Sequence, residues 1–184
     1  MKIHQNSALG ELGSTIGKGL LAGLAATAAI TISQMIEMRL TKREPSGAPL
    51  KVAKETIGAK PVNNEQKEKL ANELHWMYGT GWGIVRGLIS LTGLKGWPAT
   101  LAHFTAVWGS SMIMLPSFDA APPIYKEDAK AITIDGFHHA VYATTAGIVY
   151  DMLDAGSRSR RKINKLGKLL NIKKMAKKLK KKVA

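Results

Sequence analysis

The stretch HWMYGTGWGIVRG at residues 75–87 recurs in altered form as HAVYATTAGIVYD at residues 139–151, sixty-four residues later. Six positions are identical in the two copies: His75, Tyr78, Thr80, Gly83, Ile84 and Val85 match His139, Tyr142, Thr144, Gly147, Ile148 and Val149. A fainter echo at a spacing of eighty residues links Leu21-Ala22 with Leu101-Ala102. The repeat predicts two related helical hairpins, with a His and a Tyr at the same depth in each half.

Segment length and composition favour a membrane protein. An apolar helix of roughly 20 residues crosses a hydrocarbon core about 30 Å thick. Four candidate spans are expected at about residues 16–38, 70–93, 97–118 and 136–153. Long runs without a charged residue make the first and third spans the strongest, whereas Arg86 interrupts the second. We therefore predict an all-α, four-helix transmembrane bundle built from two repeated hairpins, with residues 1–154 as the membrane domain.

The composition of the chain excludes several kinds of chemistry. The chain contains no Cys, which rules out disulfides, thiolate nucleophiles, Fe–S clusters and Cys-ligated zinc. The polar connectors carry no phosphate-binding glycine loop, nucleophile elbow or metal-loop spacing. These observations predict a protein that is not an enzyme and needs no cofactor.

Two alternatives to the four-span membrane fold stay open. One is a soluble bundle of four buried helices, and the other is cleavage of the first span as a signal peptide.

The C-terminal segment, residues 155–184, is strongly basic. It has 13 Lys or Arg and no acidic residue between residues 158 and 182, with apolar residues at helical spacing among them. A basic amphipathic helix of this kind lies on an anionic membrane surface. The expected lipid-surface residues are Arg158, Arg160, Arg161, Lys162, Lys165 and Lys168. A solvated tail is the alternative, and nucleic-acid binding is disfavoured because the tail has no aromatic residue for base stacking.

Several short motifs stand out along the chain: Arg43-Glu44-Pro45-Ser46, His75-Trp76-Met77-Tyr78-Gly79 with Trp82-Gly83, Leu115-Pro116, Ala121-Pro122-Pro123, and His139 with Tyr142. Together they resemble the motifs of a family of small bacterial four-span integral membrane proteins without an assigned function. The resemblance covers roughly residues 15–153 and implies an inner-membrane protein, with no catalytic or cofactor residues to carry over. Ala143 stands where the family usually has Gly, and Arg86 where an aromatic residue is common. The basic tail lies outside the resemblance.

The distribution of Lys and Arg predicts how the chain is oriented. Four spans place both termini on one side of the membrane, and cytoplasmic segments carry an excess of Lys and Arg. With both termini in the cytoplasm, 17 Lys or Arg lie inside and 10 outside. The prediction of cytoplasmic termini rests on this modest excess, because the first connector, residues 39–69, is also basic.

Small residues recur every four positions on the two repeated helices. Gly79, Gly83 and Gly87 share one helix face, and Ala143 and Gly147 share the equivalent face of the other copy. Small residues at this spacing let helix backbones approach closely in lipid. We predict that the second and fourth spans pack on each other along these residues and form the centre of the bundle.

Five ionisable residues are expected near one end of the two repeated helices: Glu73, His75, Asp135, His138 and His139. Imidazole beside carboxylate can relay protons near neutral pH or bind a divalent metal. The alternative is that these residues are interfacial anchors or hydrogen-bonded packing groups. His103 enters from the opposite end of its span and is therefore a poor partner for this cluster.

Arg86 and Asp151 fall at similar depths when the two copies of the repeat are aligned. An Arg in the middle of a span costs about 2.5–3.5 kcal/mol on insertion scales unless it is relieved. We predict a structural ion pair between Arg86 and Asp151. Extension of the Arg86 side chain to the lipid phosphates is the alternative.

Three functional classes fit these features. We predict a non-enzymatic membrane scaffold or accessory component, with membrane lipids as partners and anionic headgroups preferred at the tail. A second copy of the chain or a larger membrane complex would be a further partner. The alternative is a small transporter or a proton or metal conductor that uses the His and carboxylate cluster at the repeat interface. Haem ligation by His75 and His139 is disfavoured, because close glycine packing leaves little room for a macrocycle.

Overall fold

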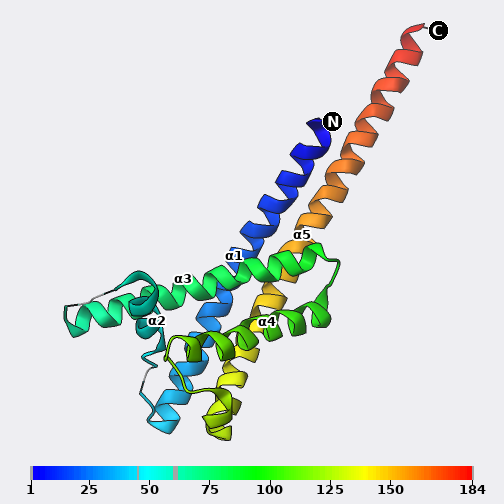
Figure 1. Cartoon of the computed structure of the whole chain (residues 1–184). Helices are drawn as coiled ribbons and strands as arrows, with labels where there is room; N and C mark the ends of the chain where they lie inside the picture. Colours follow the sequence, from blue (N-terminus) through cyan, green and yellow to red (C-terminus); the bar gives the residue numbers. More distant parts are fainter. Residues whose placement is uncertain (1, 45, 60–61, 184) are drawn as a thin grey trace. The chain divides into compact units, whose positions relative to one another are not determined.

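The computed structural model describes the backbone of residues 2–44, 46–59 and 62–183. Within these ranges it describes the side chains of residues 8–157, apart from residue 57. The described residues are helical and contain no strand, which confirms the all-α prediction. The elements are α1 (Lys2–Thr41), α2 (Ala48–Ile57), α3 (Asn64–Leu91), α4 (Gly96–Ser117), the short 3-10 helix η1 (Ile124–Lys126) and α5 (Ala129–Val183) (Figure 1).

Local sequence signals explain where the shorter helices begin and end. Asn63 caps α3, because its side chain accepts a hydrogen bond from the Gln66 amide at 2.8 Å. Gly58 ends α2 in the left-handed conformation at φ 64°, which glycine adopts without strain. α2 packs on α3 and buries Ala53. These ends fix the connector between the two long helices of the first hairpin.

α1 and α3 run in opposite directions and pack through small residues. We call this contact the glycine seam, and its members are Thr15, Gly19, Gly23 and Thr27 on α1 with Gly79, Gly83 and Gly87 on α3. A methyl group added at Gly83 would overlap the backbone of Gly19 and Gly23. At the two ends of the seam, Gly79 lies against the Thr27 side chain and Gly87 against Thr15. The seam follows the four-residue spacing that lets helix backbones approach.

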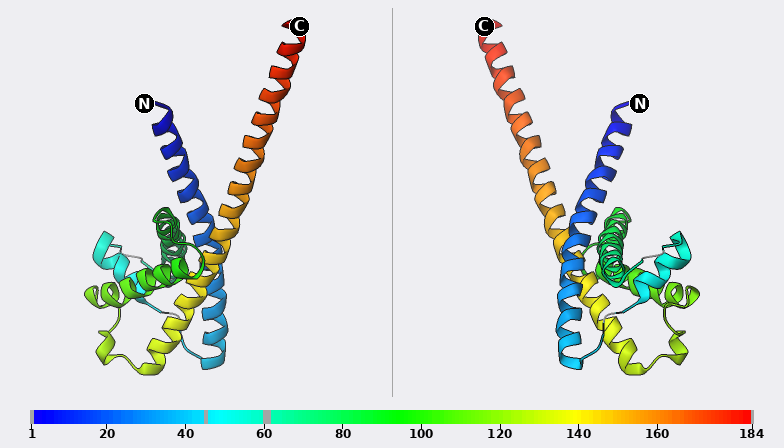
Figure 2. Two further views of the ribbon diagram at one scale, coloured as in Figure 1. Left: turned by 90° about the vertical axis from the view of Figure 1, so that its right-hand side faces the viewer. Right: turned by 90° about the vertical axis from the view of Figure 1, so that its left-hand side faces the viewer.

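Glycines of α5 also face α4 within the second hairpin, where they meet side chains rather than backbone. Gly147 lies against the Thr100 side chain and Gly136 against the Trp108 ring. Gly147 is the repeat counterpart of Gly83. Thr100 corresponds, at the eighty-residue spacing of the fainter echo, to a position between Gly19 and Gly23 of α1. In Figures 1 and 2, α3 crosses α1 obliquely and α4 crosses the first half of α5 in a similar way. Each repeated helix therefore packs on the other long helix of its own hairpin.

This arrangement corrects the predicted partner of the small residues. Gly79, Gly83 and Gly87 face α1 rather than α5, and Gly147 faces α4. The second and fourth helices do meet, but through long side chains: the Tyr142 hydroxyl donates to the Gly79 carbonyl. The reason is that the buried Tyr142 side chain reaches from α5 to α3, so a ring stands where a close backbone contact was expected.

The buried side chains of the two hairpins are mostly small or polar, and many large apolar side chains are exposed. The buried hydrophobic residues are mostly alanines, and the largest fully buried side chains are Arg86, Tyr150, His103 and Thr27. On the outer surface of α1 lie Leu9, Leu12, Leu20, Leu21, Leu24, Ile32, Met35, Ile36 and Leu40. On the other helices, the exposed apolar side chains include Met77, Leu88, Trp97, Leu101, Ile113, Phe137 and Ile148. Soluble proteins place such residues inside.

One described helix is long and apolar enough to cross a membrane, namely α1 over Ala8–Thr41. α3 begins with a charged turn and carries Arg86, and α4 contains several Gly, Ser and Thr, which lowers the hydropathy of both helices. The structure thus supports one candidate span of the four that were predicted. The remaining three spans stay predictions.

The chain divides into two compact units, Met1–Tyr150 and Asp151–Ala184, and the membrane domain of residues 1–154 stays a prediction. The second unit consists of the C-terminal part of α5, so the backbone of the basic tail is helical. The predicted lipid-surface side chains lie outside the described residues: Arg158, Arg160, Arg161, Lys162, Lys165 and Lys168. Arg86 belongs to the first unit and Asp151 to the second, so their ion pair also stays a prediction.

Candidate functional site: a histidine network on α1

Histidines from both halves of the repeat meet one stretch of α1. His75 of α3 lies with its Nε2 atom 2.9 Å from the Thr31 hydroxyl. His138 of α5 lies with its Nδ1 atom 2.8 Å from the Ser33 hydroxyl. Thr31 and Ser33 are two residues apart, so α1 holds the two histidines at nearly the same level. The two hairpins are thereby tied to a common helix.

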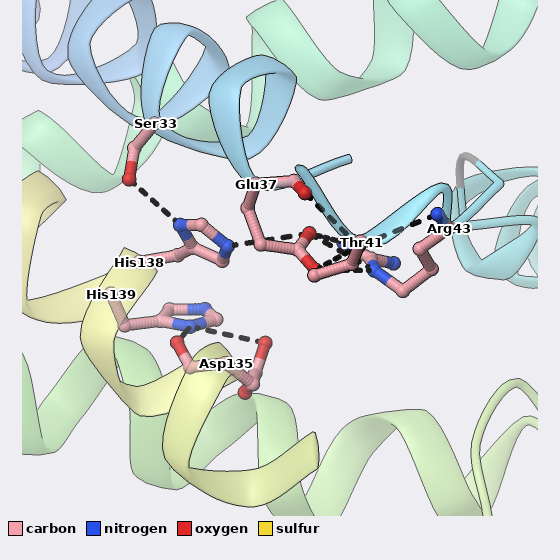
Figure 3. A network of polar contacts seen from close by, with 7 residues as sticks. All are labelled: Ser33, Glu37, Thr41, Arg43, Asp135, His138 and His139. Atoms are coloured by element: carbon pink, nitrogen blue, oxygen red, sulfur yellow. Dashed lines mark hydrogen bonds and ion pairs between the residues drawn. The ribbon is translucent and has the colours of Figure 1, made fainter. Parts of the chain in front are cut away.

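His138 also faces a carboxylate that the sequence patterns did not single out. Its Nε2 atom is 3.9 Å from Glu37 Oε2, and the His138 side chain is only 3% exposed (Figure 3). Arg43 donates to the same Glu37 oxygen from Nη2 at 2.8 Å, and Thr41 donates its hydroxyl to Oε1 at 2.8 Å. Glu37 therefore stands between a guanidinium and an imidazole. We call Ser33, His138, Glu37, Thr41 and Arg43 the histidine network.

His139 turns to a different carboxylate. Its Nδ1 atom lies 2.9 Å from the Asp135 carbonyl oxygen and 3.4 Å from Asp135 Oδ1. The Trp108 indole donates to Asp135 Oδ2 at 2.9 Å, which links α4 to the start of α5. Partial burial raises the pKa of the Asp135 carboxyl, but the contacts with His139 and Trp108 outweigh it and hold that pKa below its ordinary value. Asp135 is therefore an ionised acceptor near neutral pH.

The five residues that the sequence grouped together are thus distributed over separate contacts. His75, His138 and His139 each have their own partner, Asp135 binds His139, and Glu73 is exposed on α3. Within the part of the chain that the structure describes, no group of three or more His, Asp or Glu side chains could hold a metal ion. The residues do not form the metal site that was considered.

The sequence reasoning missed Thr31, Ser33 and Glu37 because they lie in the first predicted span. A hydroxyl residue in an apolar helix often bonds back to its own backbone, as the Thr27 hydroxyl does to the Gly23 carbonyl. The one available signal was Glu37, which ends an uncharged run four residues after Ser33. A carboxylate at the end of a candidate membrane span is expected to have a partner.

A second group of polar side chains is buried between α3, α4 and α5. His103, which is fully buried, donates from Nε2 to the Trp82 carbonyl at 3.0 Å and lies 5.7 Å from the Tyr142 ring. The Arg86 guanidinium carbon lies 4.8 Å from the centre of the Tyr150 ring, and the Tyr150 hydroxyl is 2.7 Å from the Ser90 hydroxyl. His103 therefore serves this internal group and is separate from the histidine network.

The histidine network is suited to holding helices and to moving protons, and poorly suited to nucleophilic catalysis. Ser33 and His138 have the contact that activates a nucleophile. However, Ser33 lies within α1, where backbone amides are bonded inside the helix, so the hydroxyl lacks nearby donors for an oxyanion. No protein-family model, curated protein or solved structure matches the chain. The functional argument accordingly rests on this geometry.

Proposed function

We propose that this chain is a multi-pass integral membrane protein that acts as a non-enzymatic scaffold or accessory component. The observation that carries the proposal is a distribution of side chains opposite to that of a soluble protein, with polar groups buried and large apolar groups exposed. Arg86 and His103 are fully buried, whereas leucines and isoleucines cover the outside of α1. Each large apolar side chain left in water forgoes about 1.5–3 kcal/mol of burial, a loss that disappears when lipid tails surround the helix.

The membrane placement follows from the same surface. α1 over Ala8–Thr41 is longer than the roughly 20 residues that a span needs, so it would tilt or extend beyond the hydrocarbon core. In the proposed four-span arrangement, α3, α4 and residues 136–153 of α5 cross as well, with both termini in the cytoplasm. The resemblance to small bacterial membrane proteins supports the inner membrane as the location.

The contacts of the histidines favour a structural role. His75, His138 and His103 each bond to a hydroxyl or a carbonyl of another helix. Such contacts between helices contribute about 0.6 kcal/mol on average in membrane proteins. The glycine seam holds α1 against α3, and the bonds of His138 and His103 link the two hairpins, as a scaffold or an accessory subunit requires. The basic tail would add attraction to anionic headgroups.

Proton conduction is the second candidate, and one observation favours it. His138 Nε2 is buried without a hydrogen bond and lies 3.9 Å from Glu37, so a small shift of the ring would let a proton pass between them. Proton flux into liposomes that His138→Ala abolishes would favour this function over the scaffold. A flux no greater than that of empty liposomes would leave the scaffold proposal standing alone.

Single-cysteine labelling tests the four-span arrangement. The chain has no Cys, so each engineered thiol is the only one present. We expect Glu68→Cys and Lys126→Cys to react with a membrane-impermeant maleimide in spheroplasts, and Lys95→Cys to react only after permeabilisation. All three positions are exposed in the structure, so a buried thiol would not explain a missing signal. If all three react equally from one side, α3 and α4 do not cross the membrane and the four-span proposal is overturned.

A further inference from the structure

One groove lies on the outward surface of α1, near its C-terminal end. It encloses about 180 Å³ and is lined by Ile32, Met35, Ile36 and Arg39. These residues follow one another at helical spacing, so they form a continuous strip about two turns long, or roughly 10 Å. Ile32, Met35 and Ile36 are 58%, 45% and 55% exposed. The strip is apolar along its length and cationic at its end.

The two arginines near the end of α1 differ in their surroundings. Arg43 is held by Glu37 through hydrogen bonds from Nε and Nη2, which neutralises its charge. Arg39 is exposed, and the structure gives it no hydrogen bond or ion pair among the described residues. The only carboxylate within the last turns of the helix, Glu37, is occupied by Arg43 and faces His138. Arg39 thus has its charge available at the groove.

We propose that this groove binds one acyl chain of an anionic phospholipid whose phosphate contacts Arg39. The inference rests on the membrane placement proposed above and names a lipid partner at a defined position. Guanidinium binds phosphate oxygens through paired, charge-assisted hydrogen bonds. An Arg near the end of a membrane helix extends its side chain to the headgroup region while its methylenes stay in apolar surroundings. The groove and Arg39 together match a chain with a charged headgroup.

Lipid binding to the purified full chain tests the proposal. In a neutral detergent, native mass spectrometry would measure the affinity for phosphatidylglycerol and for phosphatidylcholine. We expect Arg39→Gln to weaken phosphatidylglycerol binding roughly fivefold, because one cation at an anionic headgroup contributes about 1 kcal/mol. Arg39→Lys should recover part of the affinity. The matched control is Lys42→Gln, which removes the same charge three residues further on and does not line the groove.

A second variant separates the acyl chain from the phosphate. Met35→Trp fills the groove and should weaken phosphatidylglycerol binding while Arg39 stays in place. Soluble glycerol phosphate, which has no chain, should not bind measurably. Equal affinities for Arg39→Gln and Lys42→Gln, or glycerol phosphate binding as tight as that of the lipid, would overturn the lipid site. The proposed membrane function would fail differently, because the chain would then stay soluble without detergent.

Discussion

Replacing Gly83 by Ala should strongly destabilise the protein, although Ala is the better helix former. A methyl group at Gly83 meets the backbone of Gly19 and Gly23, which cannot move aside as a flexible side chain would. Overpacking of this kind typically costs about 1–3 kcal/mol, and Gly83→Leu should exceed that range. We expect a lowered unfolding temperature in detergent and loss of the contact between α1 and α3.

Gly81 provides the matched control on the same helix. A methyl group at Gly81 would meet no other atom within 4 Å. Gly81→Ala should therefore raise stability by about 0.5–1 kcal/mol through reduced backbone entropy in the unfolded chain. The two substitutions are chemically identical and two residues apart, so their opposite signs would isolate the glycine seam. If both variants unfold at the same temperature, the close approach of α1 and α3 is refuted.

Arg86→Ala should produce the second large loss of stability. Arg86 is the largest fully buried side chain, and its guanidinium lies over the Tyr150 ring. Truncating a large buried side chain leaves a cavity and typically costs about 2–5 kcal/mol. Arg86→Lys should recover only part of this, because an ammonium group lacks the planar surface that stacks on tyrosine. Thermal unfolding in detergent measures both effects.

Two controls show whether the loss comes from this contact. Lys95→Ala removes an equal charge at an exposed position and should change stability by less than about 0.5 kcal/mol. Tyr150→Leu combined with Arg86→Ala should cost less than the sum of the single variants, because both remove one interaction. The same cycle with Asp151→Ala tests the predicted ion pair, and strictly additive losses would refute it.

The sequence predicted the kind of elements well and their partners less well. The sixty-four-residue repeat correctly marked two related helices, and the spacing of Gly79, Gly83 and Gly87 correctly marked a face of close approach. Spacing along one helix says which face is small, and it does not say which neighbour fills that face. The similar stripes on α3 and α5 suggested mutual packing, whereas Gly79, Gly83 and Gly87 pack on α1 and Gly147 packs on α4.

The contacts of the histidines show a similar limit. His75, His138 and His139 stand out in the sequence because ionisable residues are rare in apolar segments. Their partners Thr31 and Ser33 do not, because hydroxyl residues are common in membrane helices and usually bond within their own helix. The grouping of the histidines followed from aligned depth alone, and depth along parallel copies does not fix which side chains touch. In the structure His75 and His138 each bond to a hydroxyl of α1, whereas His139 contacts Asp135.

Extraction of isolated membranes with alkaline carbonate, followed by high-speed centrifugation, most directly tests whether lipid solvates this outward-facing apolar surface. The buried Arg86 and His103 and the exposed leucines of α1 predict that the whole chain stays in the membrane pellet and dissolves only with detergent. Recovery of the folded chain in the supernatant would contradict the account.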